Sequence, residues 1–355
     1  MDIGDGNAGI ARRPMKNHQY SRWCLLALVL CLVGLSYWGI SSQAATKNFT
    51  TQLQLPKNQL TPGASYYNLK VVPGSEQLLT LSITNPSDQA KTVKVTPVNA
   101  TTADSGTIAY MPSNRQDESA ETTFTKMTST AVTVQLAPHQ QKTVTLKTKI
   151  PATGFQGEIR GGLFVADLTP SQSNQQSSST QFHLNNRFAE VTPVILRCNV
   201  DQKLRTNLKL AQVTVNPQPT VPTLTAKLRN LTPAAFGQLK IQAKVAEKAT
   251  GKIVATQTND QLAMAPNSWF NHPIMLGKQT LAAGHYILKL DLTSGKRDWH
   301  FESPFQLSKQ QVKQHNISLK KATPARPWGR WLLISGTTVS LLIGAYWLGR
   351  RQAHS

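Results

Sequence analysis

Short runs in which apolar and polar residues alternate fill the chain between residues 53 and 307. Because successive side chains of a strand point to opposite faces, each run predicts a β-strand with one buried face. Turn residues separate the runs, threonine and valine are frequent, and helical periodicity is almost absent, so we predict an all-β fold. The clearest runs are 79–83, 93–95, 132–136, 144–150, 224–228, 239–245 and 286–292.

The order of strands and turns repeats along the chain. Turns begin at Asn85 and Asn230, and an Ala-Pro pair precedes an alternating strand at Ala137 and again at Ala265. Two units with the same order predict two tandem immunoglobulin-like β-sandwiches. We place the first sandwich at residues 46–200 and the second at residues 201–308.

An uncharged tract rich in serine, glutamine and asparagine occupies residues 169–180. This composition is typical of a flexible loop or linker. Residues 182–200 are predicted to form a long strand that could return to pair with residues 163–167. We therefore predict that the tract is a flexible loop within the first sandwich and not the boundary between the domains.

The N-terminal part carries an apolar segment, Trp23 to Ile40, with 18 residues and no charge. A basic stretch ending at Arg22 precedes it, and a Ser-Gln-Ala-Ala sequence ending in Ala44 and Ala45 follows it. These three parts predict a secretory signal peptide, residues 1–45, that is cleaved near Ala44 or Ala45. An uncleaved anchor is the alternative, because 18 apolar residues can just span a bilayer.

A second apolar segment, residues 331–349, would form a helix about 28 Å long, which is enough to cross the hydrocarbon core. No LPxTG-like motif precedes it, so we predict that the anchor is a transmembrane helix followed by a cytoplasmic tail, 350–355. Aromatic rings favour the membrane interfaces, and arginines stop transfer. The residues expected to fix the anchor are Trp331, Tyr346, Trp347, Arg350 and Arg351.

The orientation of this anchor is set by two signals that disagree. Four basic residues shortly before the span outnumber the two arginines after it. The signal peptide decides, because the first segment usually dominates. We predict a single-pass type I protein of the cell membrane, with its large part in the cell wall and extracellular space. Residues 309–330 hold six basic residues and no acidic one, which predicts a basic stalk that could also bind anionic lipid or wall polymer.

Basic residues dominate the part expected outside the cell. Without residues 1–45 and 350–355, the 38 basic and 17 acidic residues fall to 32 and 15, a formal charge of about +17. This excess predicts attraction to polyanions, and an exported protein meets wall polymers and anionic lipids before nucleic acid. A basic surface that serves solubility alone is the alternative. Cys198 is the one cysteine left, so no disulfide is expected, and we predict a buried thiol.

Groups suited to catalysis or metal binding are sparse. The histidines lack metal-ligand spacing, and neither a nucleophile motif nor a phosphate-binding glycine loop is present. Asp167 and Glu190 could approach each other on paired strands, as a catalytic pair of carboxylates would. We favour a strand end for Asp167 and an exposed strand face for Glu190. Glu158 and Arg160 share a strand face, which predicts an ordinary surface ion pair. We predict a binding protein that is not an enzyme and uses no cofactor or metal.

Both halves contain recognisable motifs. Those of the first half are Pro73–Ser75, Thr84–Asp88, Asn99–Thr102 with Gly106 and Ile108, and Phe155–Gly157 leading to Gly161 and Gly162. Those of the second half are Arg187–Ala189, Met264–Phe270 and Leu281–Tyr286. Together they resemble the peptidoglycan-binding and host-binding domains of the WxL-interacting protein family of Gram-positive bacteria. Residue by residue, turns and close packing explain these positions better than ligand contacts do.

The resemblance implies a non-catalytic, membrane-anchored scaffold or adhesin on a Gram-positive cell surface. Its implied partners are peptidoglycan or anionic wall polymers, secreted WxL-domain proteins and host extracellular-matrix proteins, and no nucleic acid. An assembly chaperone or donor-strand partner, in which an exposed sheet edge captures a secreted subunit, is the alternative. The candidate binding residues are two aromatic pairs whose rings could stack on sugars or anchor a partner: Tyr66 with Tyr67, and Trp269 with Phe270. The alternative is that at least one ring of each pair packs in a core.

Overall fold

The computed structural model describes residues 49–169, 188–216, 223–276 and 280–321. Most of the loop at 169–180, the signal peptide with its cleavage site, the segment 331–349 and the tail lie outside these ranges and stay predictions. Among the described residues, no helix has the length and apolar character needed to cross a membrane. The described part is all-β, as predicted, with two short helical exceptions.

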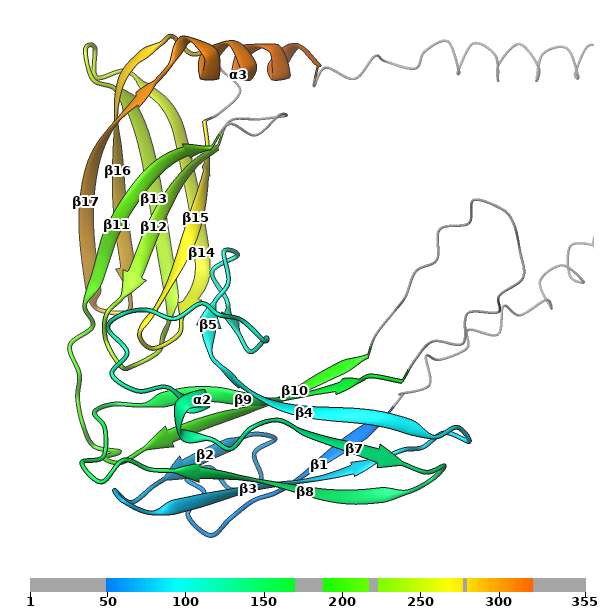
Figure 1. The fold of residues 1–355 in the computed structure, drawn as a ribbon. Coiled ribbons are helices and arrows are strands. Elements are labelled where there is room, and N and C mark those ends of the chain that lie inside the picture. Colours follow the sequence, from blue (N-terminus) through cyan, green and yellow to red (C-terminus); the bar gives the residue numbers. More distant parts are fainter. Residues whose placement is uncertain (1–48, 170–187, 217–222, 277–279, 322–355) are drawn as a thin grey trace, which may run out of the picture. The chain divides into compact units, whose positions relative to one another are not determined.

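The first sandwich consists of two sheets around one core (Figure 1). A three-stranded sheet has the order β1-β3-β8, and a five-stranded sheet has the order β2-β10-β9-β4-β7. Their strands are β1 (Thr50–Gln54), β2 (Tyr67–Lys70), β3 (Glu76–Thr84), β4 (Lys91–Asn99), β7 (Val132–Leu136), β8 (Gln141–Lys149), β9 (Ile159–Asp167) and β10 (Ala189–Arg197). β10 pairs antiparallel with β9 and parallel with β2, which confirms the return strand predicted after the loop.

The alternating residues of the first sandwich face its core. Leu79 and Leu81 of β3 are fully buried, and so are Val93 and Val95 of β4 in the opposite sheet. A long connection between β4 and β7 carries a small sheet of β5 (Thr101–Thr102) and β6 (Ile108–Ala109), and a short helix, α2 (Phe124–Met127). Cys198 is half-buried and packs against the edge of this core, so the prediction of a buried thiol holds only in part.

The second sandwich has an analogous pair of sheets, with the orders β11-β12-β15 and β14-β13-β16-β17. All neighbouring strands in them are antiparallel. The strands are β11 (Leu208–Asn216), β12 (Thr223–Asn230), β13 (Phe236–Glu247), β14 (Ile253–Met264), β15 (Ser268–Met275), β16 (Gly284–Ser294) and β17 (Arg297–Leu307). The predicted limits of the two domains and their immunoglobulin-like topology stay predictions.

Two equivalent asparagines show that the sandwiches share a local design. Asn85 donates from Nδ2 to the carbonyls of Gln89 and Ala137, at 2.8 and 3.0 Å. Asn230 donates in the same way to Ala234 and Ala265, at 2.9 and 2.8 Å. Both side chains are fully buried, so each ties a turn to the Ala-Pro corner that the sequence repeats. The two turns therefore form for the same physical reason.

Residues 309–321 were predicted as part of a basic stalk, but they form helix α3 (Lys309–Lys321), which packs on the second sandwich. Val312 is buried in the core, and Asn316 exchanges hydrogen bonds with the backbone of Leu281. Ser308 begins the helix with a reciprocal capping box, because its backbone and hydroxyl both bond to Gln311. The first half of the predicted stalk is thus part of the folded domain.

Candidate functional site: the junction between the sandwiches

Residues 100–123, between β4 and α2, reach across to the second sandwich. The hydroxyl oxygens of Thr102 and Ser268 lie 2.6 Å apart, and the amide of Ala265 donates to Thr102 Oγ1 at 3.0 Å. The carbonyl of Gly106 accepts a hydrogen bond from the amide of Ala263 at 2.7 Å. Thr102, Ala265 and Ser268 are all buried. Because unpaired polar groups are costly in such a place, these bonds fix how the loop meets the second sandwich.

Asp117 forms the first of two buried ion pairs at the junction. Both oxygens accept from the Arg229 guanidinium, at 2.8 and 2.7 Å, and the Ser119 amide and hydroxyl donate as well. Only 1% of the Asp117 side chain is exposed. Burial raises the pKa of this carboxyl, but the hydrogen bonds from Arg229 and Ser119 outweigh it and hold the pKa below its usual value. The carboxylate therefore stays charged and paired.

Glu158 forms the second buried ion pair. It accepts from Arg160 Nε at 2.7 Å, from Arg197 Nη2 at 2.5 Å and from the backbone amide of Ala235 at 2.8 Å. The pairing with Arg160 was predicted, but the prediction of a surface pair was wrong, because Glu158 is only 6% exposed. Residues far away in the sequence, Arg197 and Ala235, enclose it. The hydrogen bond from the Ala235 amide therefore ties this ion pair of the first sandwich to the second sandwich.

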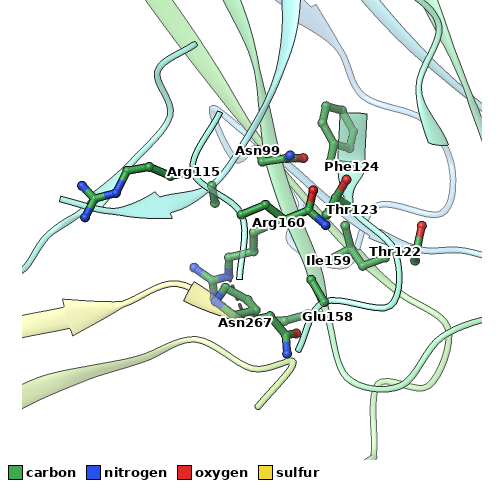
Figure 2. A pocket seen from close by; sticks show the side chains of 13 residues that line it. Asn99, Arg115, Thr122, Thr123, Phe124, Glu158, Ile159, Arg160 and Asn267 are labelled. Carbon is green, nitrogen blue, oxygen red and sulfur yellow. Dashed lines mark hydrogen bonds and ion pairs between the residues drawn. The ribbon is translucent and has the colours of Figure 1, made fainter. Parts of the chain in front are cut away.

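A small pocket lies between these contacts (Figure 2). Side chains from both sandwiches line it, including Asn99, Thr123 and Arg160 of the first and Asn267 of the second. Its volume of about 40 Å³ has room for water and is far below the several hundred Å³ of a typical ligand pocket. This pocket is therefore too small to hold a ligand of ordinary size.

Gly157 allows a close approach of the two sandwiches. A Cβ atom there would lie 2.1 Å from the carbonyl oxygen of Pro233, whereas one at Gly251 would meet nothing within 4 Å. Both glycines have φ near +65°, at +65° and +68°, so alanine costs similar backbone strain at either position. We expect Gly157→Ala to lower the free energy of unfolding by about 2 kcal/mol more than Gly251→Ala. Equal losses of unfolding free energy in the two variants, measured by thermal unfolding, would contradict the tight contact at Gly157.

The structure separates the members of the two predicted aromatic pairs. Tyr67 and Phe270 are fully buried in the two cores, and Tyr66 and Trp269 are half-buried. The alternative of core packing for one ring of each pair is therefore confirmed. The Arg115 guanidinium and the Lys227 ammonium lie 3.9 and 4.2 Å from the Trp269 ring centre, so cations already occupy this π-system. Ligand binding by Tyr66 and Trp269 stays a prediction.

An open groove with a basic lining lies at the start of β17. Its volume is about 660 Å³, and its lining includes Arg205, Lys296, Arg297, Asp298 and the edge of Trp299. Arg297 donates from Nη1 to Thr206 Oγ1 at 2.6 Å, which holds its guanidinium at the groove. Three cations against one carboxylate give the groove a positive charge that suits phosphate or carboxylate groups. We call these residues the basic groove.

Two β-sandwiches, joined by the Asp117–Arg229 ion pair and by hydrogen bonds such as that from Ala235 to Glu158, make the described part of the chain an all-β protein. In the parts that the structure describes, no group of three or more His, Cys, Asp or Glu residues could hold a metal ion. Residues 49–167 match the family description "WxL Interacting Protein, peptidoglycan binding domain", and residues 179–317 match "WxL Interacting Protein, host binding domain". The chain belongs to the WxL-interacting protein family, as its motifs indicated. No curated protein sequence matches it.

Among solved structures, the chain is similar to fimbrial-type chaperones. One is the Salmonella enterica SafA pilin in complex with the SafB chaperone, at 17% identity over 72% of this chain and 98% of that chain, with a TM-score of 0.25. Another is the E. coli chaperone DraB, at 16% identity over 72% and 98% of the two chains, with a TM-score of 0.26.

Some of the family motifs of the two halves meet at the junction. Asn99–Thr102 and Gly106 from the first half contact residues in or beside Met264–Phe270 from the second. Asn267, in the left-handed region at φ +44°, donates to the backbone and hydroxyl of Ser119. These motifs therefore help to hold the sandwiches together. This agrees with the structural role, rather than ligand contact, that their residue types favoured. Sequence reasoning missed Asp117, Arg229 and the basic groove, because nothing in their local patterns indicates contact between distant segments.

Proposed function

We propose that this protein is a membrane-anchored, non-catalytic scaffold of the cell surface. Its first sandwich holds peptidoglycan, and its second binds surface proteins, namely secreted WxL-domain proteins and host matrix proteins. The observation that carries this proposal is the match of both halves to binding domains, which together cover residues 49–167 and 179–317. The buried contacts between the sandwiches support it, because they would let one chain present two binding surfaces in a fixed relation.

The anchor is proposed on the sequence of residues 331–349 and their flanking aromatic and arginine residues. Helix α3 would then connect the second sandwich to the membrane, since it ends ten residues before that segment. We propose that the basic groove adds attraction to anionic wall polymers. Such attraction between exposed charges weakens with salt.

A sedimentation assay tests the wall-binding part of this proposal. The full-length chain, purified in detergent, is mixed with insoluble peptidoglycan at low salt and centrifuged. We expect the protein in the pellet. A chain that stays in the supernatant at low salt would contradict peptidoglycan binding.

A further inference from the structure

Helix α3 lies across one end of the second sandwich (Figure 1). Val312 anchors the helix in the core, and Asn316 exchanges hydrogen bonds with Leu281 in the loop before β16. At the start of β16, the carbonyl of His285 accepts a hydrogen bond from the amide of Lys248, in the turn between β13 and β14, at 2.9 Å. The helix, the start of β16 with its loop, and the turn therefore form one continuous surface. We call residues 247–253, 280–286 and 309–317 the α3 end.

The α3 end is strongly basic. It holds four lysines and one acidic residue, Glu247, whose carboxylate already accepts a hydrogen bond from the Thr250 hydroxyl at 2.7 Å. All four lysines are exposed, and none pairs with an acidic side chain among the described residues. The sequence continues this excess, because residues 318–330 add four basic residues and no acidic one. Unpaired, exposed cations at this density favour an anionic partner. The four lysines are Lys248, Lys252, Lys309 and Lys313.

Two exposed apolar side chains accompany these lysines. Ile253, the first residue of β14, is 52% exposed, and Ile317 of α3 is 44% exposed. Lys309, Lys313 and Ile317 follow one another at intervals of four residues, so they form one stripe along the helix. Cations beside apolar groups suit the boundary between lipid head groups and acyl chains. A soluble polyanion would pair with the lysines but would leave both isoleucines in water.

The α3 end is also the part of the fold that lies nearest, along the chain, to the predicted anchor. Only residues 322–330 separate the helix from the apolar segment 331–349. The ten peptide steps from Lys321 to Trp331 span at most about 35 Å when fully extended. If the segment crosses the membrane, the α3 end therefore stays within that distance of the bilayer, and the tether gives its lysines a high effective concentration at the head groups.

We propose that the α3 end docks the second sandwich onto the anionic surface of the cell membrane. The proposal rests on the membrane anchor in the proposed function, because the anchor brings the two surfaces within reach. The four lysines contact lipid phosphate groups, and Ile253 and Ile317 enter the boundary between head groups and acyl chains. Contacts through both the helix and the β13–β14 turn then restrain how the second sandwich tilts on the membrane.

Lysine acetylation in lipid nanodiscs tests this docking. The full-length chain is placed in discs of phosphatidylcholine alone, or of phosphatidylcholine with the anionic lipid phosphatidylglycerol, and the acetylation rate of each lysine is followed by mass spectrometry. We expect the four lysines of the α3 end to react at least about threefold more slowly on the anionic discs. Lys240 and Lys296, exposed lysines near the β16–β17 turn, should react equally on both. Salt at about 0.5 M should remove the difference, because it screens the contact.

A charge reversal separates docking from simple closeness to the membrane. Lys248→Glu/Lys252→Glu changes only the β13–β14 turn, which is exposed. If both elements dock together, Lys309 and Lys313 of this variant should lose their protection on the anionic discs. The matched control, Lys240→Glu/Lys296→Glu, makes the same change in net charge and should keep that protection. Protection that persists equally in both variants would contradict the combined surface.

The outcomes also distinguish the docking from the anchor. Equal acetylation of the four lysines on the two kinds of disc would overturn the docking, while incorporation of the chain into the discs would leave the anchor standing. A chain that enters neither kind of disc would overturn the anchor and the docking together. Protection that appears on neutral discs only when soluble polyphosphate is added would assign the α3 end to anionic wall polymers and overturn the bilayer as its partner.

Discussion

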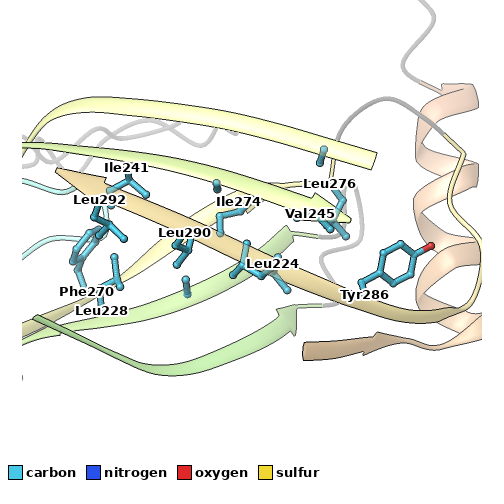
Figure 3. Packing of buried hydrophobic residues seen from close by; sticks show 14 of the residues in the cluster. Leu224, Leu228, Ile241, Val245, Phe270, Ile274, Leu276, Tyr286, Leu290 and Leu292 are labelled. Atoms are coloured by element: carbon cyan, nitrogen blue, oxygen red, sulfur yellow. The ribbon is translucent and has the colours of Figure 1, made fainter. Parts of the chain in front are cut away.

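Lowering the pH from 6.5 to 4 is expected to destabilise the second sandwich by about 3 kcal/mol through His272. This side chain is 3% exposed and lies on β15 between Phe270 and Ile274, which point into the same core (Figure 3). Within the described residues, its Nε2 has no hydrogen-bond partner. Burial lowers the pKa of His272 from 6.5 to about 4, because the apolar surroundings disfavour the charged ring.

The direction of this effect follows from proton binding. Between the two pKa values the unfolded chain binds a proton at His272 and the folded chain does not, so stability falls as the pH falls. The contribution is fully present above pH 6.5 and is lost by about pH 4. We expect His272→Leu to flatten the stability profile in this window, as measured by chemical denaturation at a series of pH values. An unchanged slope would contradict the assignment.

His300 provides a control of opposite sign. It is an exposed residue of β17, and hydrogen bonding to Asp291, with the nearby charges of Asp291 and Asp298, raises the pKa of its ring. Its contribution is therefore present below the unfolded pKa and lost as the pH rises through the raised value. His300→Gln should leave the acidic side of the profile unchanged, since that side depends on His272.

Removal of Arg229 is the second substitution with a large expected effect. It leaves Asp117, whose side chain is 1% exposed, with only the Ser119 donors. A buried carboxylate that loses its cation costs about 3 to 5 kcal/mol. We expect Arg229→Ala to lower the free energy of unfolding by that amount, measured in denaturant.

Lys289→Ala is the matched control, because it removes the cation of an exposed pair in the same sandwich. The Lys289 and Glu302 side chains are 50% and 61% exposed, and exposed pairs of this kind contribute little to stability because water screens them. Similar losses of unfolding free energy in Arg229→Ala and Lys289→Ala would contradict the expected effect of burial on the Asp117 pair.

Local patterns predicted the strands well, since the apolar residues of the clearest runs do face the cores. The same rule explains the aromatic pairs. Adjacent residues of a strand point to opposite sides, so one member of Trp269 and Phe270 had to face the core. Helix α3 also left a signal, because Ser308 and Gln311 have the spacing of a capping box. The basic residues in and after this helix led to the prediction of a stalk instead of a helix.

The junction could not be predicted in the same way. Glu158 and Arg160 have a spacing that predicts a shared strand face, and they are paired. What buries Glu158 is Ala235, 77 positions away, and Asp117 meets Arg229 across 112 positions. A single sequence contains no local signal for such contacts.

Binding of the full-length chain to peptidoglycan across a salt series tests the central claim most directly. Peptidoglycan freed of anionic polymers is titrated from about 0.05 M to about 0.5 M salt, where the screening length falls to about 4 Å. We expect binding to persist at the highest salt, because a domain that recognises peptidoglycan specifically does not depend on exposed charges alone. Complete loss of binding at moderate salt would contradict it and would leave only general attraction between the basic surface and polyanions.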